Sequence, residues 1–157
     1  MSTEQGSYAE LTFATLCLKH NIEIASPVVD VHGYDFIINV NEQWLKIQVK
    51  STSKPDIRYP NKPSYKIHVR KGATSMAYKE NDFHFCAVYI IPLDLFYIIP
   101  ICELNKTTIR INPDSNKCKF YKYKDNFKLL MPSPDTSMFQ GWALGDSIGK
   151  KHHKSHT

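Results

Sequence analysis

Two neighbouring segments in which polar and apolar residues alternate constrain the fold of this chain more than any other feature. Residues 34–40 and 43–50 repeat with a period of two and are rich in β-branched side chains. This pattern predicts two half-buried strands. Only Asn41 and Glu42 separate the two segments, so we expect them to pair as an antiparallel hairpin with a tight turn.

The register of this hairpin decides which polar side chains meet. If the turn is centred on residues 41 and 42, Asp35 lies opposite Gln48. Directly opposed side chains of an antiparallel pair have Cβ atoms about 5 Å apart. Lys50 follows two residues later on the same face. The sequence therefore predicts that a carboxylate, an amide and an ammonium group converge on one face of the hairpin.

The rest of the chain supplies one helix and several further strands. Helical spacing of apolar residues predicts a helix over residues 7–20, in which Ser7 and Glu10 match a capping box. Short apolar or alternating runs predict strands at residues 22–24, 64–70, 83–91, 95–99 and 107–111. Two of them, 83–91 and 95–99, are the most apolar and are expected to form a buried central hairpin. The predicted fold class is α/β, a mixed β-sheet with the first helix on one face.

Composition indicates a single domain. The chain has 157 residues, of which 42% are hydrophobic, enough for one ordinary core. We expect one domain over residues 1–149, followed by a basic and flexible tail over residues 150–157. The four cysteines show no Cys-x-x-Cys spacing, which disfavours a zinc cluster and fits reduced thiols. No segment resembles a membrane helix or a signal peptide, so a cytoplasmic protein is expected.

The net charge of +5 is concentrated in one part of the sequence. Residues 46–71 hold eight basic side chains and one acid, Asp56. Such a patch attracts a polyanion, and double-stranded DNA is the partner we expect, with a solvated loop as the alternative interpretation. Three of the cations share one face of the predicted strand 64–70. The candidate DNA contacts are Lys54, Arg58, Lys62, Lys66, His68, Arg70 and Lys71.

Other catalytic motifs are missing from the sequence. There is no Gly-x-Ser-x-Gly elbow for a nucleophilic serine. The six glycines do not cluster into a phosphate-binding loop. The hairpin face with Asp35, Gln48 and Lys50, together with Glu10 on the first helix, is the one set that assembles into a reaction.

These residues resemble the signature of the PD-(D/E)XK nucleases. That signature has an acid at the start of one hairpin strand and (D/E)-x-K on the next. Here Asp35 is the first acid, and Gln48-Val49-Lys50 stands where (D/E)-x-K is expected. The resemblance covers about residues 7–100 and implies the restriction-endonuclease-like fold, a mixed β-sheet core with flanking helices. Gln48 in place of the acid makes the chain most similar to small homing endonucleases encoded by group I introns.

The resemblance also implies a metal site and a catalytic lysine. Hydrolysis of a phosphodiester builds negative charge, which a hard cation such as Mg²⁺ stabilises with oxygen ligands. Asp35 and Glu10 are the expected carboxylate ligands, joined by the Val49 carbonyl and the Gln48 side-chain oxygen. Lys50 is expected to orient the attacking water and to stabilise the developing charge.

The implied activity is sequence-specific, magnesium-dependent cleavage of both strands of duplex DNA. Two cuts need two active sites, so a homo-oligomer, a dimer or a tetramer, is expected. Two alternatives stay open. Glu10 on the first helix is similar to the acid of Holliday-junction resolvases, which suggests a structure-specific nuclease. The neutral Gln48 leaves open a catalytically inactive DNA-binding protein.

Overall fold

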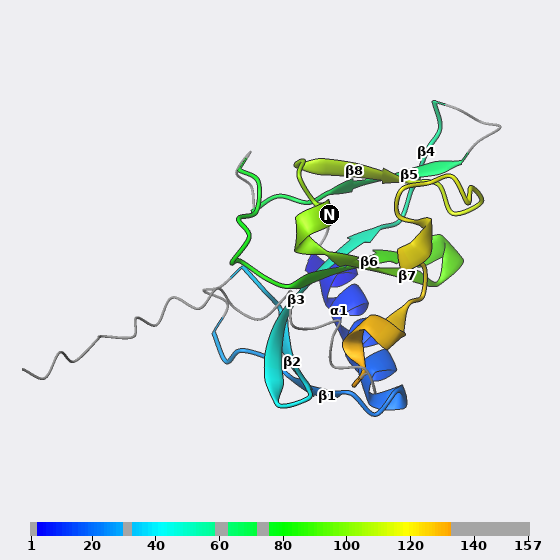
Figure 1. The fold of residues 1–157 in the computed structure, drawn as a ribbon. Helices are drawn as coiled ribbons and strands as arrows, with labels where there is room; N and C mark the ends of the chain where they lie inside the picture. Colours follow the sequence, from blue (N-terminus) through cyan, green and yellow to red (C-terminus); the bar gives the residue numbers. More distant parts are fainter. Residues whose placement is uncertain (1–2, 30–32, 59–62, 72–75, 133–157) are drawn as a thin grey trace, which may run out of the picture.

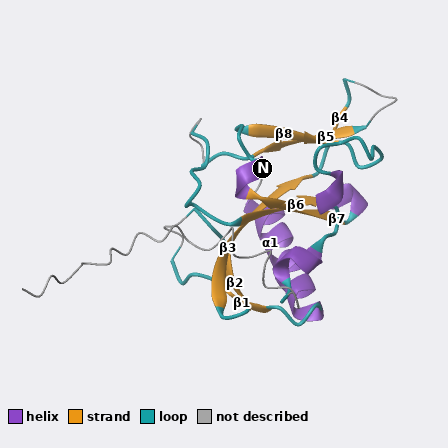
Figure 2. Cartoon of the chain, viewed as in Figure 1, coloured by secondary structure: helices purple, strands orange, loops and turns teal. Residues whose placement is uncertain are grey.

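The computed structural model describes residues 3–29, 33–58, 63–71 and 76–132, which form three layers. Helix α1 covers one face of a five-stranded sheet, and a three-stranded sheet lies over the other face (Figures 1 and 2). In chain order the elements are α1 (Thr3–Lys19), β1 (Glu23–Ala25), β2 (Phe36–Val40), β3 (Gln43–Thr52), β4 (Pro55–Asp56), β5 (Ser64–His68), β6 (Phe85–Ile90), η1 (Ile91–Leu93), β7 (Leu95–Pro100), η2 (Ile101–Glu103), β8 (Thr108–Ile111), η3 (Tyr121–Tyr123) and η4 (Phe127–Leu130).

The predicted hairpin is confirmed as β2 and β3. The strands pair antiparallel, with Phe36 opposite Ile47 and Val40 opposite Gln43. Asn41 and Glu42 form the turn with φ values of 52° and 65°. Positive φ at both central residues follows the right-handed twist of the flanking strands, which is why this turn closes so tightly. The register is the one that the sequence predicts.

The five-stranded sheet has the order β1-β2-β3-β6-β7 and is mixed. Strands β6 and β7 form the predicted buried hairpin, and all six residues of β6 are buried. β6 runs parallel to β3, with Lys50 beside Val88. A parallel pair needs a long crossover connection. Here the crossover contains β4 and β5, so the basic segment of the chain is carried across one face of the sheet.

The three-stranded sheet, of order β4-β5-β8, covers that face. In β5, Tyr65 and Ile67 are buried against β6 and β7, whereas Lys66 and His68 are exposed. The predicted alternation of this strand is therefore confirmed. Its cations keep their charged ends in solvent while its apolar side chains form the second core of the molecule.

Helix α1 covers the opposite face and begins earlier than the sequence suggests. Ala9, Phe13 and Cys17 are buried against the five-stranded sheet. Because the helix starts at Thr3, Ser7 lies within it and the predicted capping box is wrong. Hydrogen bonds from the first turn to β3 provide the physical reason, since tertiary contacts hold residues that the local pattern leaves out.

Two predictions about the ends of the chain lie outside the described residues. The last part of the predicted domain, residues 133–149, and the predicted tail, residues 150–157, belong to the segment that the structure does not describe. In the part of the chain that is described, no helix is both long and apolar enough to cross a membrane.

Candidate active site

Asp35 lies just before β2, where the hairpin holds its carboxylate against β3. Its backbone N–H donates to the Ile47 carbonyl at 2.8 Å, which extends the strand pairing by one step. Its Oδ2 atom accepts one hydrogen bond from the backbone N–H of Val49 at 2.6 Å and a second from Gln48 Nε2 at 2.6 Å. Two donors therefore fix one carboxylate oxygen at the middle of β3.

Gln48 is the only polar or charged side chain classed as buried among the described residues, with 7% of its surface exposed. A buried amide is costly unless it is hydrogen-bonded. Besides Asp35, its Nε2 atom donates to the Val49 carbonyl at 3.1 Å. The amide nitrogen thus lies between a carboxylate oxygen and a carbonyl oxygen, the two atoms predicted to bind metal.

This arrangement fits a hard divalent cation. Two oxygens, one from Asp35 and one from Val49, converge on a single position that now holds a hydrogen-bond donor. Rotation of the Gln48 carboxamide about its last bond exchanges nitrogen for oxygen and completes an all-oxygen set. No group of three or more His, Cys, Asp or Glu side chains suitable for a metal gathers within the described residues. The site therefore depends on carbonyl and amide oxygens as well as carboxylates.

Glu10 reaches the neighbourhood of Asp35 from helix α1. Both carboxylates line one hollow of about 500 Å³, and among the described residues they are the only charged side chains that line it. We call it the acidic hollow. Its lining residues are Ser7, Glu10, Leu11, Ala14, Ser26, Pro27, Tyr34, Asp35 and Phe36. The structure thus brings the two predicted acids to one surface, although they come from different layers of the fold.

Lys50 lies on the same face of β3 as Gln48, as the alternation predicts. Its Nζ atom is 5.6 Å from the centre of the Tyr78 ring. The charges of Lys50 and Asp35 both affect the pKa of the buried Cys86 thiol. Burial raises its pKa to about 12, with a lowering contribution from Lys50 and a raising contribution from Asp35. Cys86 is the residue beside Gln48 on β6, so the ammonium and the carboxylate flank one position of the sheet.

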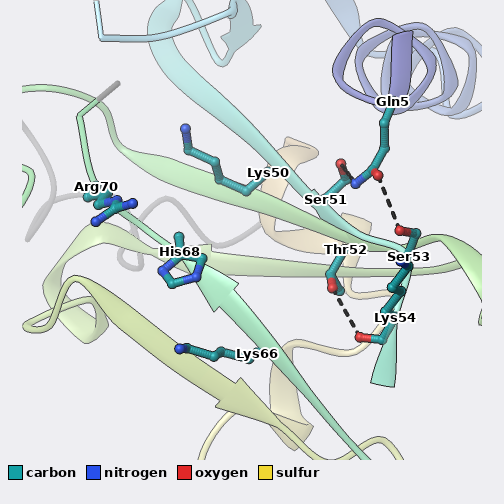
Figure 3. A pocket seen from close by; sticks show the side chains of 9 residues that line it. All are labelled: Gln5, Lys50, Ser51, Thr52, Ser53, Lys54, Lys66, His68 and Arg70. Carbon is teal, nitrogen blue, oxygen red and sulfur yellow. Dashed lines mark hydrogen bonds between the residues drawn. The ribbon is translucent and has the colours of Figure 1, made fainter. Parts of the chain in front are cut away.

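Lys50 also lines a second hollow, which has a volume of about 510 Å³. This hollow lies between β3, β5 and the start of α1. Among the described residues, every charged or titratable side chain that lines it is a base. We call it the basic pocket. Figure 3 shows Lys66 and His68 on one side and the end of β3 with Gln5 on the other. Its lining residues are Gln5, Lys50, Ser51, Thr52, Ser53, Lys54, Lys66, His68 and Arg70.

Burial and neighbouring cations both favour the neutral form of His68. Partial burial of the ring lowers its pKa, and the positive charges of Lys66 and Arg70 lower it further. The imidazole is therefore neutral at pH 7. Its Nδ1 atom is 3.3 Å from Thr108 Oγ1, which ties the ring to β8.

The remaining predicted DNA contacts fall into two groups. Lys54, Lys66, His68 and Arg70 line the basic pocket. Two others instead form ion pairs away from its lining: Arg58 Nε with Asp56 at 3.1 Å, and Lys71 Nζ with Asp82 at 2.7 Å. Asp56 also contacts Arg110, and these two arginines hold the pKa of its carboxyl well below its usual range. Lys62 lies outside the described residues.

The structure adds residues that the sequence analysis missed. Gln5 Nε2 donates to Ser51 Oγ at 3.1 Å, and Ser53 Oγ donates to Gln5 Oε1 at 3.2 Å. One amide therefore ties α1 to the end of β3. Tyr78 lies against Lys50. Gln5 precedes the predicted helix, and no periodic pattern surrounds Tyr78. Neither residue could therefore be identified as part of the site from the sequence.

Comparison with known proteins shows what the whole chain is similar to. The sequence profile of the PD-(D/E)XK endonucleases matches residues 1–130, most of the chain. Among solved structures, the bacterial homing endonuclease I-Ssp6803I is similar, with a TM-score of 0.66 and 25% sequence identity. The similarity covers 82% of this chain and 91% of that one. Comparison with curated protein sequences found no match.

Proposed function

Because this chain belongs to the PD-(D/E)XK endonuclease family, we propose that it is a magnesium-dependent, sequence-specific endonuclease that makes double-strand breaks in DNA, in the manner of a homing endonuclease. The observation that carries this proposal is the Asp35 carboxylate held by Gln48 and Val49, with Lys50 next along the same strand. An acid, a segment with oxygen ligands for a metal ion and a cation follow one another in the order of the family's signature, which supports the proposal.

Asp35, the Val49 carbonyl, the Gln48 side-chain oxygen and Glu10 would hold the metal ion. When bound, Mg²⁺ withdraws charge from the scissile phosphate and from the water that attacks it. Since Gln48 is neutral, the two carboxylates are the only anionic ligands in this set. We therefore expect modest metal affinity in the absence of DNA, whose phosphates add further oxygen ligands.

Lys50 would act on the reacting phosphate. Its ammonium group extends from the strand that carries the metal ligands, and it donates hydrogen bonds to the attacking water and to the phosphate oxygens. Its positive charge stabilises the negative charge that develops as the phosphodiester bond breaks. In this site Gln48 positions Asp35 in the resting state, because its amide holds the carboxylate oxygen at 2.6 Å.

The basic pocket would bind the DNA backbone on either side of the cleaved bond. Lys50 belongs both to this pocket and to the catalytic strand, so a strand bound by Lys66 and Arg70 would lie next to the reacting position. Lysines suit phosphate contacts, and Arg70 is suited to read a base edge. One chain carries one such site. Cutting both strands therefore calls for a symmetric homo-oligomer.

The test is incubation of the purified chain with a plasmid library of random inserts, with Mg²⁺ or with a chelator. We expect linear products whose ends share one long sequence, only when Mg²⁺ is present, and none with Asp35→Asn. A chain that cuts four-way junctions without base preference is instead a junction resolvase. Binding without cleavage under every metal condition contradicts the proposal.

A further inference from the structure

The further inference concerns how the Lys50 side chain is held in place, and it rests on the proposed function. Lysine has a flexible four-carbon stem, and rotamer entropy opposes holding it in one orientation. Within the described residues Lys50 takes part in no ion pair. Its ammonium lies 5.6 Å from the centre of the Tyr78 ring, inside the range of a cation–π contact.

The Tyr78 ring is itself fixed. It packs edge-on against Phe83, with ring centres 4.7 Å apart and planes at 70°. Phe83 is only 1% exposed, so it anchors the tyrosine to the second core. Burial raises the pKa of Tyr78, and the negative charges of Asp35 and Asp82 raise it further. The ring therefore stays a neutral phenol and presents a face that attracts a cation.

Hydrogen bonds and one ion pair hold the residues on either side of Tyr78. Lys71 Nζ contacts Asp82 at 2.7 Å, and Asp82 also accepts from the Lys79 backbone N–H at 2.6 Å. The Lys71 backbone N–H donates to the Met76 carbonyl at 3.1 Å. These contacts bracket Tyr78 on both sides in the sequence. Lys71, predicted as a DNA contact, therefore has a structural role through its ion pair with Asp82.

Tyr78 also reaches the carboxylate side of the site. A Cβ atom added to Gly33 would lie 3.8 Å from Tyr78 Cε1, so the ring packs beside the backbone that leads into Asp35. One aromatic side chain thus lies near Gly33, in the segment that leads into β2, and near Lys50 on β3.

From these contacts we propose that Tyr78 is a positioning residue, whose ring face holds the Lys50 ammonium in the orientation used for cleavage. It acts through Lys50 and does not touch the substrate. The aromatic face is the necessary feature, and the hydroxyl group is not. Phenylalanine therefore replaces it, whereas leucine keeps an apolar side chain but has no aromatic face to attract the ammonium.

The experiment compares Tyr78→Phe with Tyr78→Leu, and Tyr121→Leu is the matched control. Tyr121, on η3, has an exposed ring whose centre lies 5.8 Å from Lys124 Nζ, a similar contact far from the site. For cleavage we use supercoiled plasmid carrying a site that the wild-type chain cuts, at saturating Mg²⁺. We expect Tyr78→Leu to lower kcat about tenfold with KM and plasmid affinity unchanged. Tyr78→Phe and Tyr121→Leu should stay within about threefold of wild type.

A second measurement needs no activity. The Lys50 side-chain methylene protons should show an upfield ring-current shift by NMR in the wild type and in Tyr78→Phe, lost in Tyr78→Leu. Wild-type kcat in Tyr78→Leu, equal losses in both variants, or no ring-current shift in an active wild type overturns the role of Tyr78. A wild type that shows the shift but cuts no DNA overturns the proposed function instead.

Discussion

The acidic hollow and the basic pocket carry charges of opposite sign and are joined by a single strand. In the described part of the chain, the charged side chains that line the acidic hollow are Glu10 and Asp35, whereas those that line the basic pocket are all cations. Residues 48–50 of β3 link them. On the proposed function, metal binding and DNA binding would therefore use separate surfaces. Substitutions should therefore separate cleavage from affinity, and each prediction below tests that separation.

The largest effect is expected at Asp35. Asp35→Asn keeps the shape of the side chain but removes the charge that holds the metal, so single-turnover cleavage should fall about a thousandfold or more. Plasmid affinity should stay within about threefold, because the basic pocket is intact. Gel-shift and cleavage assays on the same samples measure both. Asp114→Asn, an exposed acid elsewhere, is the control. A parallel loss of binding would show that the two surfaces are not separate.

The opposite result is expected from the basic pocket. Removal of two cations in Lys66→Ala/Arg70→Ala should weaken plasmid binding about 30-fold and reduce the slope of log affinity against log salt by about 2. Cleavage at saturating DNA should remain within about fivefold. Lys128→Ala, on η4, serves as the control. An unchanged salt slope contradicts the assignment of this pocket to the DNA backbone.

Gln48 tests whether its amide nitrogen marks the metal position. Gln48→Glu removes donors to Asp35 and Val49 and puts a second carboxylate beside the first. Without metal it should lose about 2 kcal/mol of stability. Thermal unfolding with and without Mg²⁺ measures this, and the metal should restore the loss in the variant. If Mg²⁺ gives the variant no more stability than it gives wild type, the amide does not stand at the metal position.

Glu10 should have a smaller effect, since it reaches the site from another layer. Glu10→Gln should raise the Mg²⁺ concentration needed for half-maximal cleavage about tenfold, with the maximal rate nearly restored at high metal. A Mg²⁺ titration of the initial rate measures this effect. An unchanged midpoint would mean that Glu10 only shapes the acidic hollow.

The smallest effect concerns pH. The pKa of His68 is lowered by its surroundings, so the ring is neutral at pH 7 and gains its charge only as pH falls through that lowered value. Bound phosphate favours the charged form. Plasmid affinity should therefore rise about threefold between pH 7 and pH 5. His68→Gln should lose this rise, and a wild-type pH dependence in that variant refutes the role of His68.

Local patterns predicted the hairpin but not the assembly of layers. The register of β2 and β3 follows from alternation and a two-residue turn, and both act over short distances. The parallel pairing of β6 with β3 depends on a crossover of some thirty residues, which no local pattern encodes. The prediction of where α1 begins was wrong for a related reason. Gln5 is held by Ser51 and Ser53, partners far away in the sequence.

In the candidate site, too, local patterns grouped neighbouring residues but not residues distant in the sequence. Asp35, Gln48 and Lys50 could be grouped because one hairpin carries all three. The segment of Tyr78 shows no periodicity, and its place beside Lys50 depends on contacts with Phe83 and Asp82. Arg58 and Lys71 were predicted from charge alone, and charge does not reveal that an acid already pairs with each of them.

The most direct test of the account is Lys50→Ala, with cleavage and plasmid binding measured on the same preparation and Lys46→Ala, from the same face of β3, as the control. The account predicts that Lys50→Ala abolishes Mg²⁺-dependent cleavage while binding falls only slightly, and that Lys46→Ala still cleaves. Retained cleavage in Lys50→Ala would contradict it.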